Sequence, residues 1–278
     1  MRYGIVLPVD DPHAAIDLAI RAEAAGWDGV FVWDGIWGAD PWIVMAAMAV
    51  HTERIKLGPL ITPISRRRPW KLASEALTLD QVSRGRAILP LGLGAPGDVF
   101  AKVGEATDRK VRAELLDEGI DLLTGFWSGQ PYSYNGKHFQ IDNVRFDQTP
   151  VQRPRIPIWV VAAWPRPKSM QRVLRCDGML PVKMTDNGGT TMITPDEIAP
   201  IKAFVDRGRS ASTPFDIVIE SWMPLRDRAR TLDQIAAYAA AGATWWLDNV
   251  WAVSDAFDDV RTADQMRERI EQGPPQLA

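Results

Sequence analysis

The chain has a single cysteine, Cys176, and only three histidines among its 278 residues. One cysteine excludes an internal disulfide and any multi-cysteine metal site, and it is typical of a reducing compartment. The histidines, His13, His51 and His138, are far apart, and none has the HExxH spacing of a zinc enzyme. We therefore expect no metal site.

Long apolar runs and blocks of one charge sign are also missing. The N-terminal apolar run is shorter than the roughly 7–15-residue core of a signal peptide, and no stretch reaches the roughly 18 apolar residues of a membrane span. Lys and Arg total 32 against 35 Asp and Glu, so the formal net charge is only -3. We expect a cytoplasmic protein that binds neither nucleic acid nor a membrane.

Hydrophobic residues make up 46% of the chain, which is enough for a large core. Eight short apolar runs alternate with segments of helical spacing, and no linker divides the chain. The runs are Tyr3–Leu7, Gly29–Trp33, Ile55–Ile61, Ala87–Gly92, Ile156–Ala162, Gly178–Val182, Phe215–Glu220 and Thr244–Leu247. Strands that are apolar on both faces and alternate with helices are typical of a parallel sheet. The pattern predicts an α/β fold, a single-domain (β/α)8 TIM barrel over residues 1–278, with a doubly wound sheet as the alternative.

One segment breaks this alternation. Between Tyr132 and Ile141, the dipeptide Asn135-Gly136 separates two runs of alternating polarity. This is the signature of a β-hairpin, which we expect as an excursion between the fourth helix and the fifth strand.

In a barrel of this kind the functional residues follow the C-terminal ends of the strands. The segments at those positions include Asp34–Trp37, Thr62–Ile64, Gly92–Ala95 and Ala162–Pro165. They are rich in Trp, Gly and Pro and poor in His, Cys and paired carboxylates. Such a rim suits a flat aromatic ligand, held by stacking and backbone contacts, better than hydrolysis or metal chemistry.

Several motifs, in the same order along the chain, match one family. They are Ala24–Asp34, Asp40–Trp42, Thr52–Pro63, Arg66–Ala73, Leu79-Asp80, Gly92–Gly94, Leu116–Gly119, Phe126–Gly129 and Pro150–Pro154. On these motifs the chain, from Met1 to about Leu247, resembles the bacterial luciferase-like flavin-dependent oxidoreductases. The resemblance implies a (β/α)8 barrel that binds reduced FMN or an F-420-type deazaflavin, without distinguishing the two, and that performs hydride transfer or monooxygenation on a small organic substrate.

The resemblance also implies cofactor-binding residues. Leu60, Ile61 and Thr62 match the turn in which the family often has a non-prolyl cis peptide beneath the ring. Gly92 and Gly94 match the glycines that let the backbone approach the ring. The alternatives are that Thr62 merely ends a strand and that the glycines merely form a turn.

A third match is the phosphate loop after the fifth strand. Ala162, Ala163 and Trp164 stand where the family has smaller residues, and Arg166 and Lys168 are available as compensating cations. The alternative is a surface loop with solvated charges.

Two departures concern catalysis. Where the family commonly has Asp-His this chain has Asp34-Gly35, and Ala95 replaces a Glu of the related sugar-phosphate dehydrogenases. Oxidation of an alcohol by a positioned base is therefore disfavoured. Asp34, as a hydrogen-bond partner of cofactor or substrate, and Trp37, as an aromatic wall, remain the candidate catalytic residues; the alternatives are a loop cap and simple packing.

We therefore predict a flavin- or deazaflavin-dependent oxidoreductase. A non-catalytic flavin-binding barrel protein and a cofactor-independent barrel enzyme are the alternatives. The run Arg66–Arg68 is interpreted as the solvated start of a helix or a subunit contact. The resemblance implies a homodimer, for which the apolar segment Trp42–Met48 is suited, unless the hairpin at Tyr132–Ile141 covers it.

Overall fold

The computed structural model describes residues 1–7, 10–94, 99–186, 189–221, 228–249 and 263–276. Its strands are β1 (Arg2–Leu7), β2 (Gly29–Val32), β3 (Lys56–Pro59), β4 (Thr62–Pro63), β5 (Leu89–Gly92), β8 (Ile158–Trp164), β9 (Gly178–Met184), β11 (Asp216–Ser221) and β12 (Trp245–Asp248). They pair in the order β3-β2-β1-β12-β11-β9-β8-β5-β4, and all of these pairings are parallel.

The two edge strands of this sheet, β3 and β4, are consecutive in the chain, and only Leu60 and Ile61 separate them. A bridge from Leu57 in β3 to Ala87, just before β5, brings the ends together. The eight runs predicted from the sequence thus form one nearly closed barrel. The (β/α)8 prediction is confirmed, and the doubly wound alternative is wrong.

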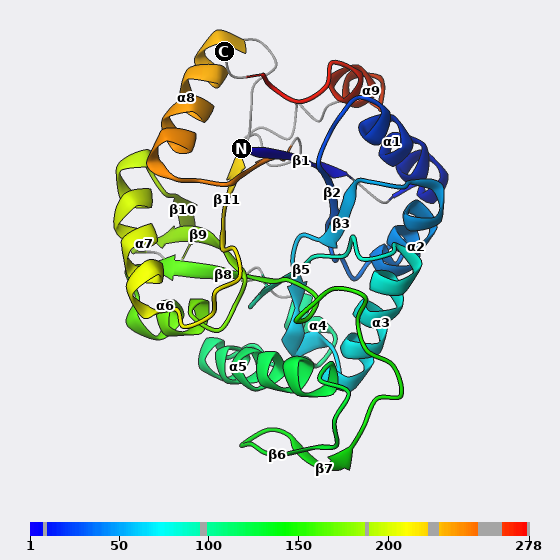
Figure 1. Cartoon of the computed structure of the whole chain (residues 1–278), viewed down its shortest axis with the longest axis vertical. Coiled ribbons are helices and arrows are strands. Elements are labelled where there is room, and N and C mark those ends of the chain that lie inside the picture. The colour runs from blue at the N-terminus through cyan, green and yellow to red at the C-terminus, as the bar shows by residue number, and fades with distance from the viewer. Residues whose placement is uncertain (8–9, 95–98, 187–188, 222–227, 250–262, 277–278) are drawn as a thin grey trace.

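Helices surround this ring of strands (Figure 1). They are α1 (Pro12–Ala24), α2 (Pro41–His51), α3 (Pro69–Val82), α4 (Val99–Lys102), α5 (Arg109–Phe126), α6 (Pro167–Val173), α7 (Pro195–Gly208), α8 (Arg228–Ala241) and α9 (Ala263–Glu271), with a short 3₁₀ turn η1 (Ile64–Arg66). Within the described residues, no helix combines the length and the apolar character that crossing a membrane requires.

Large aromatic side chains fill the inside of the barrel. Phe31 stacks on Trp159 with ring centroids 5.5 Å apart, and Trp159 meets Trp245 edge-on at 5.3 Å. Glycines on the neighbouring strands make room for them: a Cβ at Gly4 would lie 2.8 Å from the Phe31 ring. The barrel is therefore a packed core closed below the mouth.

The predicted hairpin is confirmed. Strands β6 (Tyr132–Asn135) and β7 (Gln140–Val144) pair antiparallel and leave the barrel between α5 and β8 (Figure 1). The Glu118 carboxylate on α5 accepts the backbone N–H groups of Lys137, His138 and Phe139, at 2.8–3.1 Å. This fastens the hairpin to α5, away from α2.

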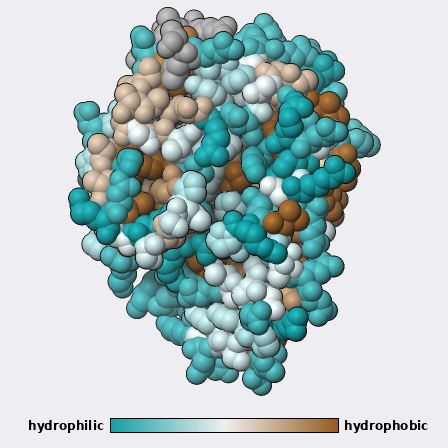
Figure 2. Space-filling model, in the orientation of Figure 1, coloured by the Kyte–Doolittle hydropathy of each residue, from teal (hydrophilic) through white to brown (hydrophobic). Residues whose placement is uncertain are grey.

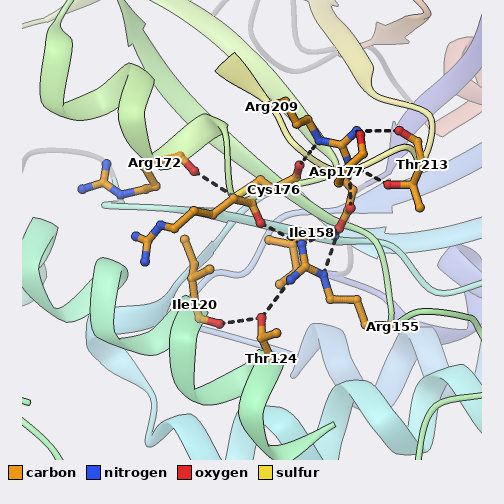
Figure 3. Close-up of polar contacts among 11 residues, drawn as sticks. Ile120, Thr124, Arg155, Ile158, Arg172, Cys176, Asp177, Arg209 and Thr213 are labelled. Atoms are coloured by element: carbon orange, nitrogen blue, oxygen red, sulfur yellow. Dashed lines mark hydrogen bonds and ion pairs between the residues drawn. The ribbon is translucent and has the colours of Figure 1, made fainter. Parts of the chain in front are cut away.

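An ion-pair cluster closes the opposite, N-terminal end of β8 and β9 (Figure 3). The Asp177 carboxylate accepts from Arg155, with Nη2 at 3.0 Å, and from Arg209, with Nη2 at 3.2 Å. It also accepts the backbone N–H of Ile158 at 3.1 Å. Next to it the Cys176 thiol is fully buried, and burial raises its pKa to about 12, so this cysteine is inert at neutral pH. Both features are structural.

Removing the shared carboxylate should therefore destabilise the barrel. Asp177→Ala leaves two largely buried guanidinium groups without their partner, and we expect the free energy of unfolding to fall by about 3 kcal/mol in a urea titration. Asp206→Ala is the control, because Asp206 forms only an exposed pair with Lys202, and it should cost less than about 0.5 kcal/mol. Equal loss in both variants would contradict a structural role for the cluster.

Candidate functional site

The mouth of the barrel brings together the turn after β3 and the end of β5. The peptide bond between Leu60 and Ile61 is cis, as the family resemblance implies. Beyond it, Thr62 pairs with Leu91 and Pro63 with Gly92 in the ladder between β4 and β5. The two segments that the sequence assigned to cofactor binding are thus adjacent.

Position 92 has to be a glycine because Ile61, just before β4, lies against it. A Cβ at Gly92 would lie 2.8 Å from Ile61 Cδ1 and 3.4 Å from Val161 Cγ2. Ile61 and Val161 are both partly exposed, and both pack on the inner core of the barrel. Gly92 is itself buried, so its missing Cβ makes room for Ile61. Together Ile61 and Val161 form an apolar floor at the mouth that a flat ring can lie on.

Gly94 has a different role. Its φ of +81° lies in the left-handed region, and a Cβ there would meet Phe100 Cζ at 2.5 Å and Pro63 Cβ at 3.1 Å. Arg112 donates to the carbonyl oxygen of the preceding Leu93 at 2.9 Å. Gly94 therefore serves the conformation of the turn.

Asp34 follows β2 and lies at the centre of a hydrogen-bond network. Its side chain is 3% exposed. One carboxylate oxygen accepts from Thr62 Oγ1 at 2.7 Å and from Trp42 Nε1 at 3.4 Å. The other accepts from Arg67 Nη2 at 3.2 Å and from Arg66 Nη2 at 3.4 Å. Both oxygens are engaged within the protein, which favours the loop-capping interpretation of Asp34 over direct contact with a ligand.

The arginine run is not the solvated helix start that the sequence predicted. Arg66 and Arg67 are largely buried and pair with Asp34, and only Arg68 is exposed, over the Trp70 ring. Burial lowers the pKa of Arg66. Burial is also the largest single effect on the pKa of Arg67 and lowers it, but the charge and hydrogen bond of Asp34 together with the charges of Glu75 and Asp40 outweigh it, and the net shift is upward. The prediction failed because a run of three arginines says nothing about where each side chain turns.

Trp37 is 65% exposed and stands out from the loop between β2 and α2. A shallow pocket of about 310 Å³ lies beside this loop, and the residues around it include Asp34, Gly35, Arg66 and Glu105 but not Trp37. The structure brings Asp34 to the arginines and leaves Trp37 apart from them.

The loop after β8 offers few free donors. The Ala163 N–H donates to Ser169 Oγ at 2.9 Å, and the Arg166 N–H donates to the Ala163 carbonyl oxygen at 2.9 Å. Pro165 and Pro167 have no N–H. Trp164 packs edge-on against Phe204 with centroids 6.4 Å apart. The charged groups that could meet an anion in this loop are the side chains of Arg166 and Lys168, which are both exposed.

One group at the mouth had no role in the sequence-based prediction. Glu220, near the end of β11, accepts a hydrogen bond from the side-chain amide of Asn249, which follows β12. Burial raises the pKa of Glu220, and the Asn249 hydrogen bond only partly offsets that effect. The signal was present in the apolar run Phe215–Glu220, where a carboxylate continues the inward-facing alternation of Val218.

Two other predictions concern Ala95 and the absence of a metal site. Ala95, where related enzymes have a Glu, lies outside the described residues. Among the residues that are described, no group of three or more His, Cys, Asp or Glu side chains has a geometry that could hold a metal ion.

Comparison with known proteins places this geometry in context. A model of the luciferase-like monooxygenase family matches residues 1–273. A Mycobacterium tuberculosis protein, named as a candidate coenzyme F420-dependent oxidoreductase, is 31% identical over 196 residues, which cover 66% of this chain and 55% of that protein. An F420-dependent glucose-6-phosphate dehydrogenase of Amycolatopsis mediterranei is 29% identical over 164 residues, which cover 55% of this chain and 49% of the enzyme. The matches thus span about half the length of these curated relatives.

Among solved structures, the coenzyme F420-dependent tetrahydromethanopterin reductase of Methanopyrus kandleri superposes with a TM-score of 0.74. The identity is 19%, and the match covers 100% of this chain and 99% of that one. This likeness confirms the barrel fold.

The network around Asp34 gives a test of its structural role. Asp34→Ala leaves Arg66 and Arg67 buried without their shared counter-ion, so we expect the free energy of unfolding to fall by about 3–5 kcal/mol. Asp10→Ala removes an exposed carboxylate and should change it by less than about 0.5 kcal/mol. Urea titrations measure both. An Asp34→Ala protein as stable as the parent would show that the carboxylate does not hold the arginines.

Proposed function

The chain belongs to the luciferase-like monooxygenase family, and we propose that it is an oxidoreductase that binds a flavin or a deazaflavin and acts on a small organic molecule. The observation that carries the proposal is the apolar floor of Ile61 and Val161, which packs against the Gly92 backbone at the C-terminal mouth of the barrel. In this fold that mouth is the place of catalysis.

The residues present fit a flat tricyclic ring. Ile61 and Val161 would exclude water from one face of the ring, and Gly92 would let Ile61 lie close to the backbone, which leaves room for the ring. Thr62 holds this turn through its hydrogen bond to Asp34, 2.7 Å long. When bound, a flavin or deazaflavin supplies hydride transfer, and the protein supplies position and a dry surface.

One observation bears on which cofactor is bound, and another bears on which reaction it performs. The names of the two curated relatives both contain F420, which favours the deazaflavin. Against an alcohol dehydrogenase reaction stands Gly35, which provides no side chain for acid–base work after Asp34. We therefore favour transfer of a hydride from the reduced deazaflavin to an organic acceptor, with the FMN-dependent reaction and the non-catalytic binding protein as alternatives.

The decisive experiment compares the two cofactors directly. Purified protein is titrated with F420 and with FMN, followed by absorbance and fluorescence, and turnover is then measured with each reduced cofactor and a panel of organic acceptors. Binding with turnover supports an enzyme, and binding without turnover on any acceptor supports the non-catalytic alternative. Failure to bind either cofactor would overturn the proposal.

Adding one methyl group should weaken binding of the ring. In Gly92→Ala the new Cβ would lie 2.8 Å from Ile61 Cδ1, so Ile61 must move into the space that the ring needs. We expect about tenfold weaker binding of F420 or FMN, from an overpacking cost of about 1–3 kcal/mol. Gly35→Ala is the matched control, because a Cβ there would meet nothing within 4 Å. Equal affinities in both variants and the parent would place the ring elsewhere.

We also propose that the protein forms a homodimer through α2. Trp42, Met45 and Met48 are buried against the barrel, whereas Ile43 and Val50 on the outer face are 72% and 66% exposed. The hairpin does not cover this face, so that alternative is wrong. Figure 2 shows hydrophobic surface along the edge formed by α1 and α2. A second copy of the chain is the partner that the family resemblance implies for such a surface.

Charges placed on that face should separate the subunits. The chain mass is 30.9 kDa, and at micromolar concentration we expect sedimentation to give a species of twice that mass. The double variant Ile43→Glu, Val50→Glu should sediment as a monomer, because two buried charges would have no partner. Val144→Glu, at the end of the hairpin, is the control and should remain dimeric. A monomeric parent would defeat the proposal.

A further inference from the structure

Strands β9 and β11 separate as they approach the mouth of the barrel. They pair only at Gly178 with Asp216 and at Met179 with Ile217, whereas β9 stays paired with β8 as far as Lys183. The Asp216 N–H donates to the Asp177 carbonyl oxygen at 3.0 Å. Alternation along a parallel ladder then places the next β9 donors toward β11 at residues 179 and 181. Residue 181 is a proline, which has no N–H, so the ladder ends there.

The opening between the two strands contains a chamber of about 240 Å³. Strand β10 (Thr190–Met192) runs antiparallel to β9 and borders it. The walls are mostly aliphatic, and Glu220 is the one ionisable residue among those that line the chamber. A dry apolar cavity of about 150 Å³ suffices to bind benzene. This chamber therefore has room for a ring of that size with a short substituent.

The Glu220 carboxyl lies at the inner side of this chamber. It shares the inward face of β11 with Val218, and within the described part of the chain its hydrogen-bond partner is the Asn249 amide, itself 1% exposed. Charged groups on the neighbouring strands are paired elsewhere: Lys183 with Glu197 at 2.7 Å, and Asp248 with Arg269 at 2.8 Å. No described cation balances Glu220.

These surroundings favour the neutral carboxyl. Burial raises the pKa of Glu220, so its protonated form, a hydrogen-bond donor, persists to higher pH than that of an ordinary glutamate. An ammonium group would bring three donors into a largely aliphatic chamber, whereas a carbonyl oxygen needs only one donor. The chemistry of the chamber thus matches an apolar ketone or aldehyde better than an amine.

We propose that the chamber between β9, β10 and β11 is a substrate subsite for an apolar carbonyl compound, whose oxygen accepts a hydrogen bond from the Glu220 carboxyl. In the order of the barrel, β11 stands opposite the β3–β4 path. A molecule held here would face the mouth across from the Leu60–Thr62 turn. The claim that this molecule is a substrate rests on the proposed function. The claim that it binds in the chamber is independent of that function.

The test uses three probes of similar shape on the cofactor-free protein at pH 6: acetophenone, ethylbenzene and benzylamine. Ligand-observed NMR titrations give the affinities. We expect acetophenone to bind about two- to tenfold more tightly than ethylbenzene, the worth of one net hydrogen bond. This preference should persist in Glu220→Gln, whose amide still donates, and vanish in Glu220→Ala. Glu114→Gln on α5, whose carboxylate pairs with Lys137 of the hairpin, is the control and should keep it.

Raising the pH provides a second measurement. The preference for acetophenone should fall as Glu220 loses its proton in the parent and should stay constant in Glu220→Gln. The infrared C=O stretching band of a protonated carboxyl should be present in the parent and absent from Glu220→Gln. Equal binding of acetophenone and ethylbenzene to the parent, or tighter binding of benzylamine, would overturn the inference. A failed flavin or F420 titration with the ketone preference intact would instead overturn only the proposed function.

Discussion

The mouth of the barrel depends on the hydrogen bonds and ion pairs that the Asp34 carboxylate forms. It joins the end of β2 to Thr62, in the turn after the cis peptide, and to Arg66 and Arg67, at the start of the segment that leads to α3. Two guanidinium groups in a largely buried position need such a counter-ion, since an unpaired buried charge is very costly. The same carboxylate that neutralises them also holds the floor of the candidate cofactor site. The stability of the mouth and the proposed cofactor site therefore depend on one network.

Most of the fold could be predicted from hydrophobic periodicity. Runs such as Gly29–Trp33 and Ile156–Ala162 are apolar on both faces, and only a strand covered on both sides requires that. Asn135-Gly136 marked the hairpin equally well. Periodicity could not show that the third run is interrupted after Pro59, because Leu60 and Ile61 are as apolar as a continuous strand. That detail came from the family resemblance.

For the candidate site, the sequence predicted which segments lie together but not the partners of their side chains. Thr62 and Gly92 end neighbouring strands, so their proximity follows from the topology. The pairing of Asp34 with Arg66 and Arg67 joins residues more than thirty positions apart, and side-chain direction decides it. The Ser169 hydroxyl that occupies the Ala163 N–H is equally invisible in the sequence. Glu220 was missed because one carboxylate at the end of an apolar run predicts only the end of a strand.

The two sides of the mouth are built differently. On the β2–β5 side, an ion-pair network and close backbone packing leave little freedom, which suits a ring that must be held in one orientation. On the β9–β11 side, Pro181 ends the ladder and leaves a chamber, while Trp159 and Trp245 keep the barrel packed below it. Because the walls of this chamber are side chains of β9, β10 and β11, substitutions there change its shape without touching Asp34 or Gly92. If the proposed sites are right, such a division would let one barrel keep its cofactor side while its choice of substrate varies.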